Sequence, residues 1–212
     1  WSVLFFLFFS PVKFFTRNFA VFLSKIWTSS IMALSKKILG IDCIIHGEKN
    51  ILNNKPILIA SNHQAAWETF FLTYFFNDPV FILKKELKMI PILKWYFEKL
   101  DFIFIDRNKG FNSLKHTINS INNLVNKGRK IFIIFPEGTR LKPNEQGSLN
   151  PGVFAIHKIL KMIVIPIKHD SGKYWINGKI LKKPGKIKIE IFPPIKSLDK
   201  KKFLEKLRKI YY

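Results

Sequence analysis

The sequence is poor in cysteine and lacks the common motifs for zinc binding and for a serine nucleophile. Cys43 is the only cysteine among 212 residues, so no disulfide can form within the chain. No His-Glu-x-x-His motif and no pair of closely spaced cysteines is present, and we therefore expect no metal site. The Gly-x-Ser-x-Gly turn of serine hydrolases is also missing. These absences argue against zinc chemistry and against a serine intermediate of that type.

Acidic residues are scarce as well. The chain has 36 Lys and Arg residues against 14 Asp and Glu residues, which gives a formal net charge of +22. Such a charge favours an anionic partner, which can be nucleic acid, a membrane surface or an acidic ligand. The basic residues are spread along the chain, and its N-terminal part is unusually apolar. Both features favour a membrane surface over nucleic acid.

The N-terminal segment, residues 1–39, has no hydrophobic run of the ~20 residues that a membrane-spanning helix needs. The uncharged run Trp1–Val12 is too short, and no signal-peptide cleavage site follows it. Ser10 and Pro11 are typical of a helix start. The polar residues that follow fall on one narrow stripe beside a broad aromatic face, and they are Lys13, Arg17, Ser24 and Thr28. This pattern predicts a helix at the membrane interface; the alternative is a helix packed on the domain core.

Residues 40–212 form the second predicted part, in which short apolar strands alternate with helical patterns. The chain is 48% hydrophobic with 22 Phe, which is enough for a sizeable core. Predicted strands are Ile41–His46, Ile57–Ala60, Val80–Leu83, Phe102–Ile105, Ile131–Phe135, Ile163–Ile167 (interrupted by Pro166) and Ile187–Phe192. Predicted helices begin near Gln64, Pro91 and Ser113 and cover Val153–Leu160 and Lys200–Ile210. The alternation predicts an α/β fold with a mostly parallel sheet flanked by helices.

Three polar groups of residues follow predicted strands, and ligands of open α/β sheets bind beyond the carboxyl ends of the strands. The first group is Asn62-His63 with Glu68. On one continuous helix His63 and Glu68 would point about 140° apart. They can meet if His63 lies in the bend before the helix and Glu68 reaches back over its first turn. A histidine held by a carboxylate can act as a general base on a hydroxyl; the alternative is a capping histidine and a surface glutamate.

The other two groups are typical of phosphate recognition. Gly138 permits a tight turn with exposed N–H groups, Thr139 adds a hydroxyl, and Arg140 offers a planar guanidinium. Arg107, which follows Asp106, is a second candidate guanidinium. Taken singly, each group also fits an ordinary solvated turn. Together they predict a site with a base and a phosphate-bearing substrate.

Four blocks of these residues, in order and spacing, resemble the motif blocks of the glycerolipid acyltransferase family, and within it the bacterial 1-acyl-sn-glycerol-3-phosphate acyltransferases. The blocks are Asn62–Glu68, Phe104–Arg107, Phe135–Arg140 and Val164–Ile167, and the resemblance extends over about residues 40–195. Phe-Pro-Glu-Gly-Thr-Arg is the most specific block. Three positions depart from the family pattern. Glu68 replaces the usual Asp, Leu100 or Asp101 stands where Gly is common, and Asn150 stands where Lys is common.

The resemblance implies a role for each block. His63 would be the general base, with Glu68 orienting it, and Arg107 would bind the acceptor phosphate. The block of Glu137, Gly138, Thr139 and Arg140 would shape the glycerol-phosphate site. Pro166 and its neighbours would line the side of the acyl donor. The implied reaction is acylation of the sn-2 hydroxyl of lysophosphatidate in phospholipid biosynthesis.

The implied partners are lysophosphatidate, an anionic membrane surface and an acyl thioester of coenzyme A or acyl carrier protein, with no further cofactor. The implied location is the cytoplasmic face of a bacterial inner membrane. Three alternatives stay open. One is the same chemistry on another lysolipid or on glycerol-3-phosphate. The second is a basic nucleic-acid-binding protein, which would explain the charge but not the polar groups. The third is a membrane-surface adaptor without catalysis.

Overall fold

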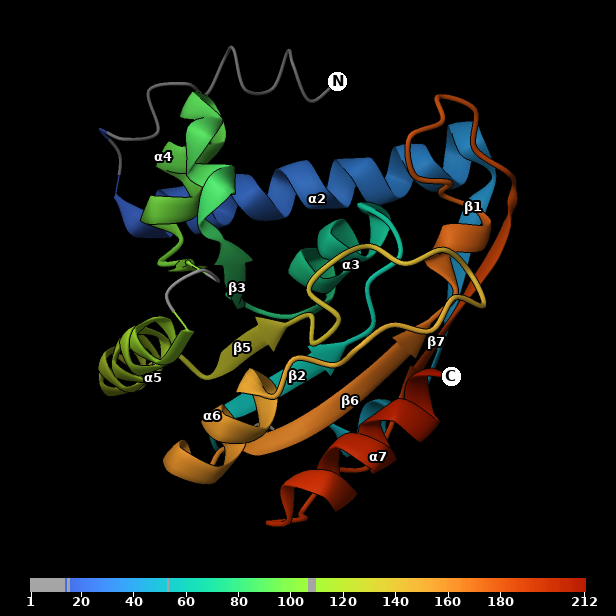
Figure 1. Cartoon of the computed structure of the whole chain (residues 1–212). Helices are drawn as coiled ribbons and strands as arrows, with labels where there is room; N and C mark the ends of the chain where they lie inside the picture. Colours follow the sequence, from blue (N-terminus) through green and yellow to red (C-terminus); the bar gives the residue numbers. More distant parts are fainter. Residues whose placement is uncertain (1–13, 15, 53, 107–109) are drawn as a thin grey trace.

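A twisted sheet lies at the centre of the protein, as the computed structural model in Figure 1 shows. The structure describes residues 14, 16–52, 54–106 and 110–212. Within these residues, seven strands form the sheet. The strands are β1 (Ile41–His46), β2 (Ile57–Ser61), β3 (Val80–Lys84), β4 (Ile103–Ile105), β5 (Ile131–Ile134), β6 (Ile163–His169) and β7 (Gly185–Ile191). All seven were expected from the apolar runs, with ends that differ by a few residues.

The strand order is β1-β7-β6-β2-β5-β3-β4. Strands β2 to β6 all run parallel to one another, whereas β6 pairs with β7 in antiparallel fashion and β7 pairs with β1 in parallel. The prediction of an α/β fold with a mostly parallel sheet is therefore confirmed. This order places β2 at the middle of the sheet, between β5 and β6.

Helices cover both faces of the sheet (Figure 1). They are α2 (Arg17–Leu39), α3 (Trp67–Phe75), α4 (Pro91–Lys99), α5 (Gly110–Asn126), α6 (Gly152–Leu160) and α7 (Lys200–Tyr211). Alternate residues of β2 reach opposite faces, because side chains of a strand point to alternate sides. Ile57 and Ile59 pack in the core under α2 and α3. Leu58 and Ala60 pack in the core under α5, α6 and α7.

Two expected helix starts and one expected interruption were wrong. Helix α3 begins at Trp67 instead of near Gln64, because the residues after His63 form a turn. Helix α5 begins at Gly110, so Ser113 is a buried helical residue and not a cap. Pro166 does not interrupt β6. Its carbonyl accepts the N–H of Phe192, one residue past the end of β7, so the proline lies where the pairing of β6 with β7 ends and a missing N–H is tolerated.

The polar stripe of α2 faces the domain, and several large apolar side chains lie among the exposed residues of the helix. The expected start at Ser10, together with Lys13, lies outside the described residues; the described helix is capped by Thr16. Ser24 and Thr28 are buried against the domain, with hydroxyls bonded to carbonyls of their own helix. The large apolar side chains that remain exposed on the helix are Phe22 (57%), Ile26 (43%), Leu34 (36%) and Ile38 (71%). Within the described part of the chain, no helix is long and apolar enough to cross a membrane.

An ion cluster fixes the start of α2 to the domain. The Arg17 guanidinium donates to both carboxylate oxygens of Asp78, at 2.6 and 2.9 Å, and to Asp101 at 2.6 Å. Arg129 approaches the same two carboxylates at 3.2–3.3 Å. Asp101 has φ +60°, a left-handed conformation that glycine adopts most easily. Asp101 therefore has a strained backbone conformation, and its carboxylate binds both Arg17 and Arg129.

We expect Arg17→Ala to lower the free energy of unfolding by about 1–3 kcal/mol, because it leaves two partly buried carboxylates with only one arginine. Urea denaturation of the purified variant measures the loss. Arg17→Lys is the matched control, since it keeps the charge but not the forked geometry, and it should lose less. Equal stability of wild type and Arg17→Ala would contradict a structural role for the cluster.

Candidate active site

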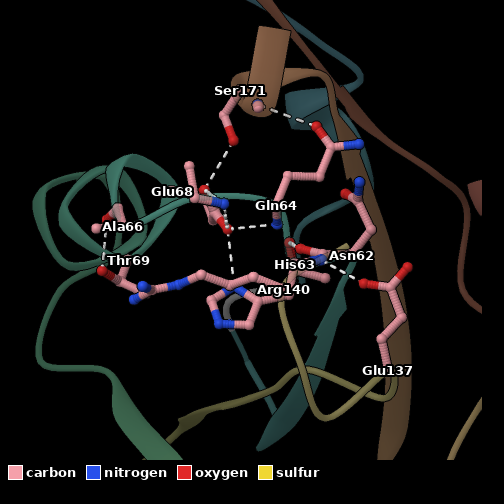
Figure 2. Close-up of polar contacts among 12 residues, drawn as sticks. Asn62, His63, Gln64, Ala66, Glu68, Thr69, Glu137, Arg140 and Ser171 are labelled. Atoms are coloured by element: carbon pink, nitrogen blue, oxygen red, sulfur yellow. Dashed lines mark hydrogen bonds and ion pairs between the residues drawn. The ribbon is translucent and has the colours of Figure 1, made fainter. Parts of the chain in front are cut away.

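Three segments meet at the carboxyl end of β2, because β2 lies between β5 and β6. Residues 62–68 follow β2, residues 135–140 follow β5, and residues 170–172 follow β6. The Leu141 N–H donates to the carbonyl of His63 at 2.9 Å, which joins the first two segments. Figure 2 shows His63, Glu68, Glu137, Arg140 and Ser171 gathered around this point. The strand order thus brings together residues that lie far apart in the sequence.

His63 and Glu68 form the expected pair. His63 lies in the turn after β2, and its Nδ1 is 2.8 Å from Oε1 of Glu68, which reaches back from the first turn of α3 (Figure 2). An ionised Glu68 can only accept a hydrogen bond, so Nδ1 carries the proton and Nε2 keeps its lone pair. The His63 ring also stacks on Phe135, with centroids 4.1 Å apart. Orientation by the carboxylate and the aromatic ring leaves Nε2 as the basic atom.

Glu68 is buried, with an exposed fraction of 1%, and is held by several donors. Its Oε1 accepts the N–H groups of Gln64 and Ala65, both at 2.8 Å. Its Oε2 accepts the hydroxyl of Ser171 at 2.7 Å. Burial opposes ionisation of Glu68, but the charge of His169, the hydrogen bond and charge of His63 and the Ala65 N–H together lower its pKa to about 2. Glu68 is therefore a fixed anion at neutral pH.

Glu137 is a second carboxylate beside His63, and its pKa is raised whereas that of Glu68 is lowered. Its Oε2 accepts the backbone N–H of His63 at 2.6 Å, and its Oε1 accepts the hydroxyl of Tyr212 at 2.8 Å. Burial raises the pKa of Glu137 to about 7, the charge of Glu68 adds to the rise, and the two hydrogen bonds oppose it. Glu137 thus braces the turn that carries the base. Environments that push two neighbouring carboxylate pKa values apart are typical of active sites.

The rest of the Phe135–Arg140 block forms an open turn beside the histidine. The Gly138 N–H donates to the carbonyl of Phe135 at 3.0 Å, and Gly138 has φ +70°. Thr139 and Arg140 are exposed. Nη1 of Arg140 lies 3.4 Å from Oδ1 of Asn177, at the outer limit of a hydrogen bond. The guanidinium of Arg140 is therefore available to an anionic ligand at this edge of the sheet.

Arg107 lies outside the described residues, so its predicted phosphate role stays a prediction. Its neighbour Asp106 follows β4 and accepts a hydrogen bond from Lys85 at 2.6 Å. Strand β4 is the third strand from β2 in the sheet order. At a spacing of about 4.8 Å per strand, its end is separated from that of β2 by about 14 Å.

A cavity of about 490 Å³ opens on the α5–α6 side of the site. Its wall includes Phe135 and Gly138, and the remaining lining is largely apolar, from Ile82, Ile105, Leu114, Ile134, Phe154 and Ile156 among others. Phe135 therefore separates this cavity from the His63 ring. A second cavity, of about 330 Å³, lies next to Glu137 and Tyr212. Pro166 is buried within β6 and lines neither cavity. The predicted role of Pro166 on the side of the acyl donor stays a prediction.

Comparison with known proteins places this arrangement in a family. The family model described as Acyltransferase matches residues 42–170. The 1-acyl-sn-glycerol-3-phosphate acyltransferase of Pseudomonas aeruginosa is 34% identical over 193 residues, which is 91% of this chain and 74% of that protein. The chain belongs to the acyltransferase family.

Two other acyltransferases show how far the similarity extends. The 1-acyl-sn-glycerol-3-phosphate acyltransferase of Saccharomyces cerevisiae is 32% identical over 135 residues, 62% of this chain and 44% of that protein. The crystal structure of the 1-acyl-sn-glycerophosphate acyltransferase from Thermotoga maritima superposes with a TM-score of 0.73, covering 98% of this chain and 91% of that one. Its sequence identity is 22%, so this superposition supports the fold alone.

Sequence reasoning missed two residues of this acyltransferase. Ser171, which binds Glu68, and Tyr212, which binds Glu137, belong to no recognisable motif. Tyr212 also accepts the N–H of Gly147 at 2.9 Å. A serine two residues after a strand and a tyrosine at the end of a basic helix are common features. Only their contacts with the two carboxylates indicate that they support the active site.

The other histidines have structural roles or lie away from the base. The side-chain amide of Asn62 pairs with the backbone of His169 in both directions at 2.9 Å, and Nε2 of His169 bonds to the carbonyl of Asn62. Burial lowers the pKa of His169, and the charge of the neighbouring Glu68 opposes this shift. His157 is buried with Nδ1 on the carbonyl of Met162. Within the described ranges, no three His, Cys, Asp or Glu residues gather as ligands for a metal ion.

We expect Glu68→Gln to reduce kcat of this acyltransferase by about 10²–10⁴-fold, because a neutral amide neither fixes the Nδ1 tautomer nor stabilises the protonated ring. Ser171→Ala should reduce kcat less, since Oε1 of Glu68 keeps its partners. Steady-state kinetics with separate kcat and KM values checks both. A Glu68→Gln variant with wild-type kcat would contradict the assigned role.

The raised pKa of Glu137 predicts a pH-dependent loss of stability. An unfolded glutamate ionises near pH 4.5, whereas Glu137 ionises near 7 in the folded protein. The native state therefore binds more protons between these values, and stability falls as the pH rises through this window. We expect Glu137→Gln to remove this fall, which is on the order of 1–3 kcal/mol. Denaturation of both proteins at pH 5 and pH 8 measures this fall. If the free energies of unfolding of wild type and Glu137→Gln differ by the same amount at both pH values, the raised pKa is contradicted.

Proposed function

We propose that the protein transfers an acyl chain from a thioester to the sn-2 hydroxyl of 1-acylglycerol-3-phosphate and so forms phosphatidic acid. The observation that carries this proposal is the His63–Glu68 pair, in which a buried anion leaves Nε2 free to accept a proton. Relatives in the same family that carry this activity in their names support the choice of acceptor.

The reaction needs one base and no covalent enzyme intermediate. His63 Nε2 takes the proton of the sn-2 hydroxyl while the hydroxyl oxygen attacks the thioester carbonyl carbon. The carbon–sulfur bond then breaks, and the departing thiolate takes up a proton. The Glu68 carboxylate stabilises the imidazolium that forms between these steps. A placed general base contributes about 10²–10⁴-fold to such a reaction, and alignment of the two bound substrates contributes further.

The acceptor phosphate would bind at the exposed turn after β5. Arg140 offers a guanidinium there, Thr139 a hydroxyl and Gly138 a turn of the backbone. Arg107 would add a second guanidinium from the segment after β4. The approach of residues 135–140 to His63 supports a phosphate close to the reacting hydroxyl, because the Leu141 N–H bonds to the carbonyl of His63.

The apolar cavity beside Phe135 suits an acyl chain. Its volume of about 490 Å³ is typical of ligand sites. Each methylene group buried there would contribute about 0.8 kcal/mol to binding. The thioester can belong to coenzyme A or to acyl carrier protein, and the basic surface suits either of these anionic carriers.

The membrane would lie against the outer face of α2. Phe22, Ile26 and Ile38 project outward from this helix, and the exposed Lys36 and Lys37 lie near its end. Apolar side chains with lysines beside them suit a membrane interface. An anionic lipid surface also matches the net charge of +22. For a bacterial protein of this kind, the proposed location is the cytoplasmic face of the inner membrane.

Acyl transfer to lysophosphatidate tests the proposal directly. Membranes or detergent micelles with radiolabelled acyl-CoA or acyl carrier protein thioester should yield phosphatidic acid with the wild-type enzyme. His63→Ala should keep its circular dichroism spectrum and lose at least ~10²-fold in kcat. A panel with glycerol-3-phosphate and other lysolipids identifies the acceptor. Product formation by His63→Ala at the wild-type rate would overturn the mechanism, and turnover of another acceptor alone would overturn the substrate.

A further inference from the structure

The loop between β6 and β7, residues 170–184, is attached to the active site at its base. The Ser171 hydroxyl donates to Glu68 at 2.7 Å, and the Gly172 N–H donates to Oε1 of Gln64 at 3.1 Å. Farther along, Asn177 lies beside the Arg140 guanidinium. This β6–β7 loop therefore contacts both the residue that orients the base and the arginine proposed to bind phosphate.

The tip of the β6–β7 loop presents two large apolar side chains to the outside. Ile180 is 97% exposed and Leu181 is 84% exposed. The neighbouring Lys182 turns inward: its Nζ bonds to the carbonyls of Ile176 and Lys179 and lies 5.2 Å from the centroid of the Trp175 ring. The ammonium thus ties the loop together from within. An ordered turn that holds adjacent Ile and Leu side chains outward favours a partner that buries them.

The charge around the tip indicates what kind of partner this is. Residues 171–189 include six lysines and no acidic residue. Lys179 and Lys183 flank the apolar pair and are exposed. An apolar tip flanked by lysines matches the boundary of an anionic bilayer, where side chains reach the acyl region and ammonium groups reach the phosphates.

The β6–β7 loop adjoins the C-terminal end of α2. The Gly185 N–H donates to the carbonyl of Gly40 at 2.9 Å, directly after that helix. A series of aromatic contacts joins the two elements, because the Phe70 ring packs edge-on against both Trp27 of α2 and Trp175 of the loop. Figure 1 shows the loop, in orange-red, rising beside the end of α2. The apolar tip of the loop therefore lies on the same side of the protein as α2.

We propose that the β6–β7 loop is a second membrane contact, which inserts Ile180 and Leu181 into an anionic lipid surface beside the outer face of α2. This inference rests on the proposed function, since it concerns how a lipid substrate is reached. Two separate contacts fix the orientation of the protein on a surface, where one contact leaves it free to tilt. Because Asn177 lies within the same loop, the docked loop also holds Arg140 at the level of the lipid phosphates.

Vesicle flotation tests the contact with the full chain. The probes are vesicles of phosphatidylcholine alone and of phosphatidylcholine mixed with phosphatidylglycerol. The double substitution Ile180→Ser, Leu181→Ser should lower the partition coefficient for the mixed vesicles at least ~10-fold, because two exposed apolar side chains no longer enter the lipid. Lys179→Gln with Lys183→Gln should reduce the preference for anionic vesicles about fivefold for each lysine.

Leu198→Ser is the matched control. Leu198 is 71% exposed and lies just before α7, which covers the opposite face of the sheet. This variant should bind the mixed vesicles as wild type does. All variants should keep the circular dichroism spectrum of the wild type, since the substituted side chains are exposed.

Acyl transfer in two formats separates this inference from the proposed function. The Ile180→Ser, Leu181→Ser variant should lose about tenfold in kcat/KM with lysophosphatidate embedded in mixed vesicles. It should keep wild-type rates with a short-chain lysophosphatidate that is monomeric in water. Wild-type vesicle binding by this variant would overturn the loop contact whatever the activity. Absence of acyl transfer by the wild-type protein in both formats would overturn the proposed function and leave the flotation result standing.

Discussion

The buried carboxylate of Glu68 is the constraint on which the rest of the site depends. A charge without contact with water is costly unless hydrogen bonds replace the lost hydration. Here the replacements come from the turn after β2, from the loop after β6 and from the imidazole of His63. The folded chain therefore requires these segments to converge, and the same convergence fixes the tautomer of the base. The convergence of these segments therefore both stabilises the ionised Glu68 and orients the His63 ring.

The central place of β2 explains why the neighbouring segments can meet. Its two neighbours, β5 and β6, end at the same edge of the sheet and deliver Glu137 and Ser171 to either side of the histidine turn. The two carboxylates have different partners, so Glu68 is a permanent anion whereas Glu137 ionises near neutral pH. The same edge of the parallel sheet thereby holds Glu68, which stays ionised and orients the His63 ring, and Glu137, which titrates and binds the His63 backbone N–H.

The distribution of apolar side chains explains how the proposed enzyme would reach a lipid substrate. Helix α2 buries Leu23 and Ile31 together with small and polar residues against the domain, and it leaves Phe22, Ile26 and Ile38 outside. The apolar tip of the β6–β7 loop lies next to its C-terminal end, and the same loop binds Glu68 through Ser171. A lipid substrate that reaches this side of the protein would therefore meet a surface attached directly to the residues that orient the base.

Local patterns in the sequence determined the seven strands and the α/β class, because each depends on spacing along a short segment. The same patterns allowed His63 to pair with Glu68, and the resemblance to the acyltransferase motif favoured this pairing over a capping histidine. The tertiary structure alone decided which face of α2 is buried, since a helical stripe has the same period whichever side packs. It also decided that Ser171 and Tyr212 hold the two carboxylates and that Pro166 stays inside β6. These contacts join residues 75 to 103 positions apart, and their geometry follows from strand order, which no local pattern encodes.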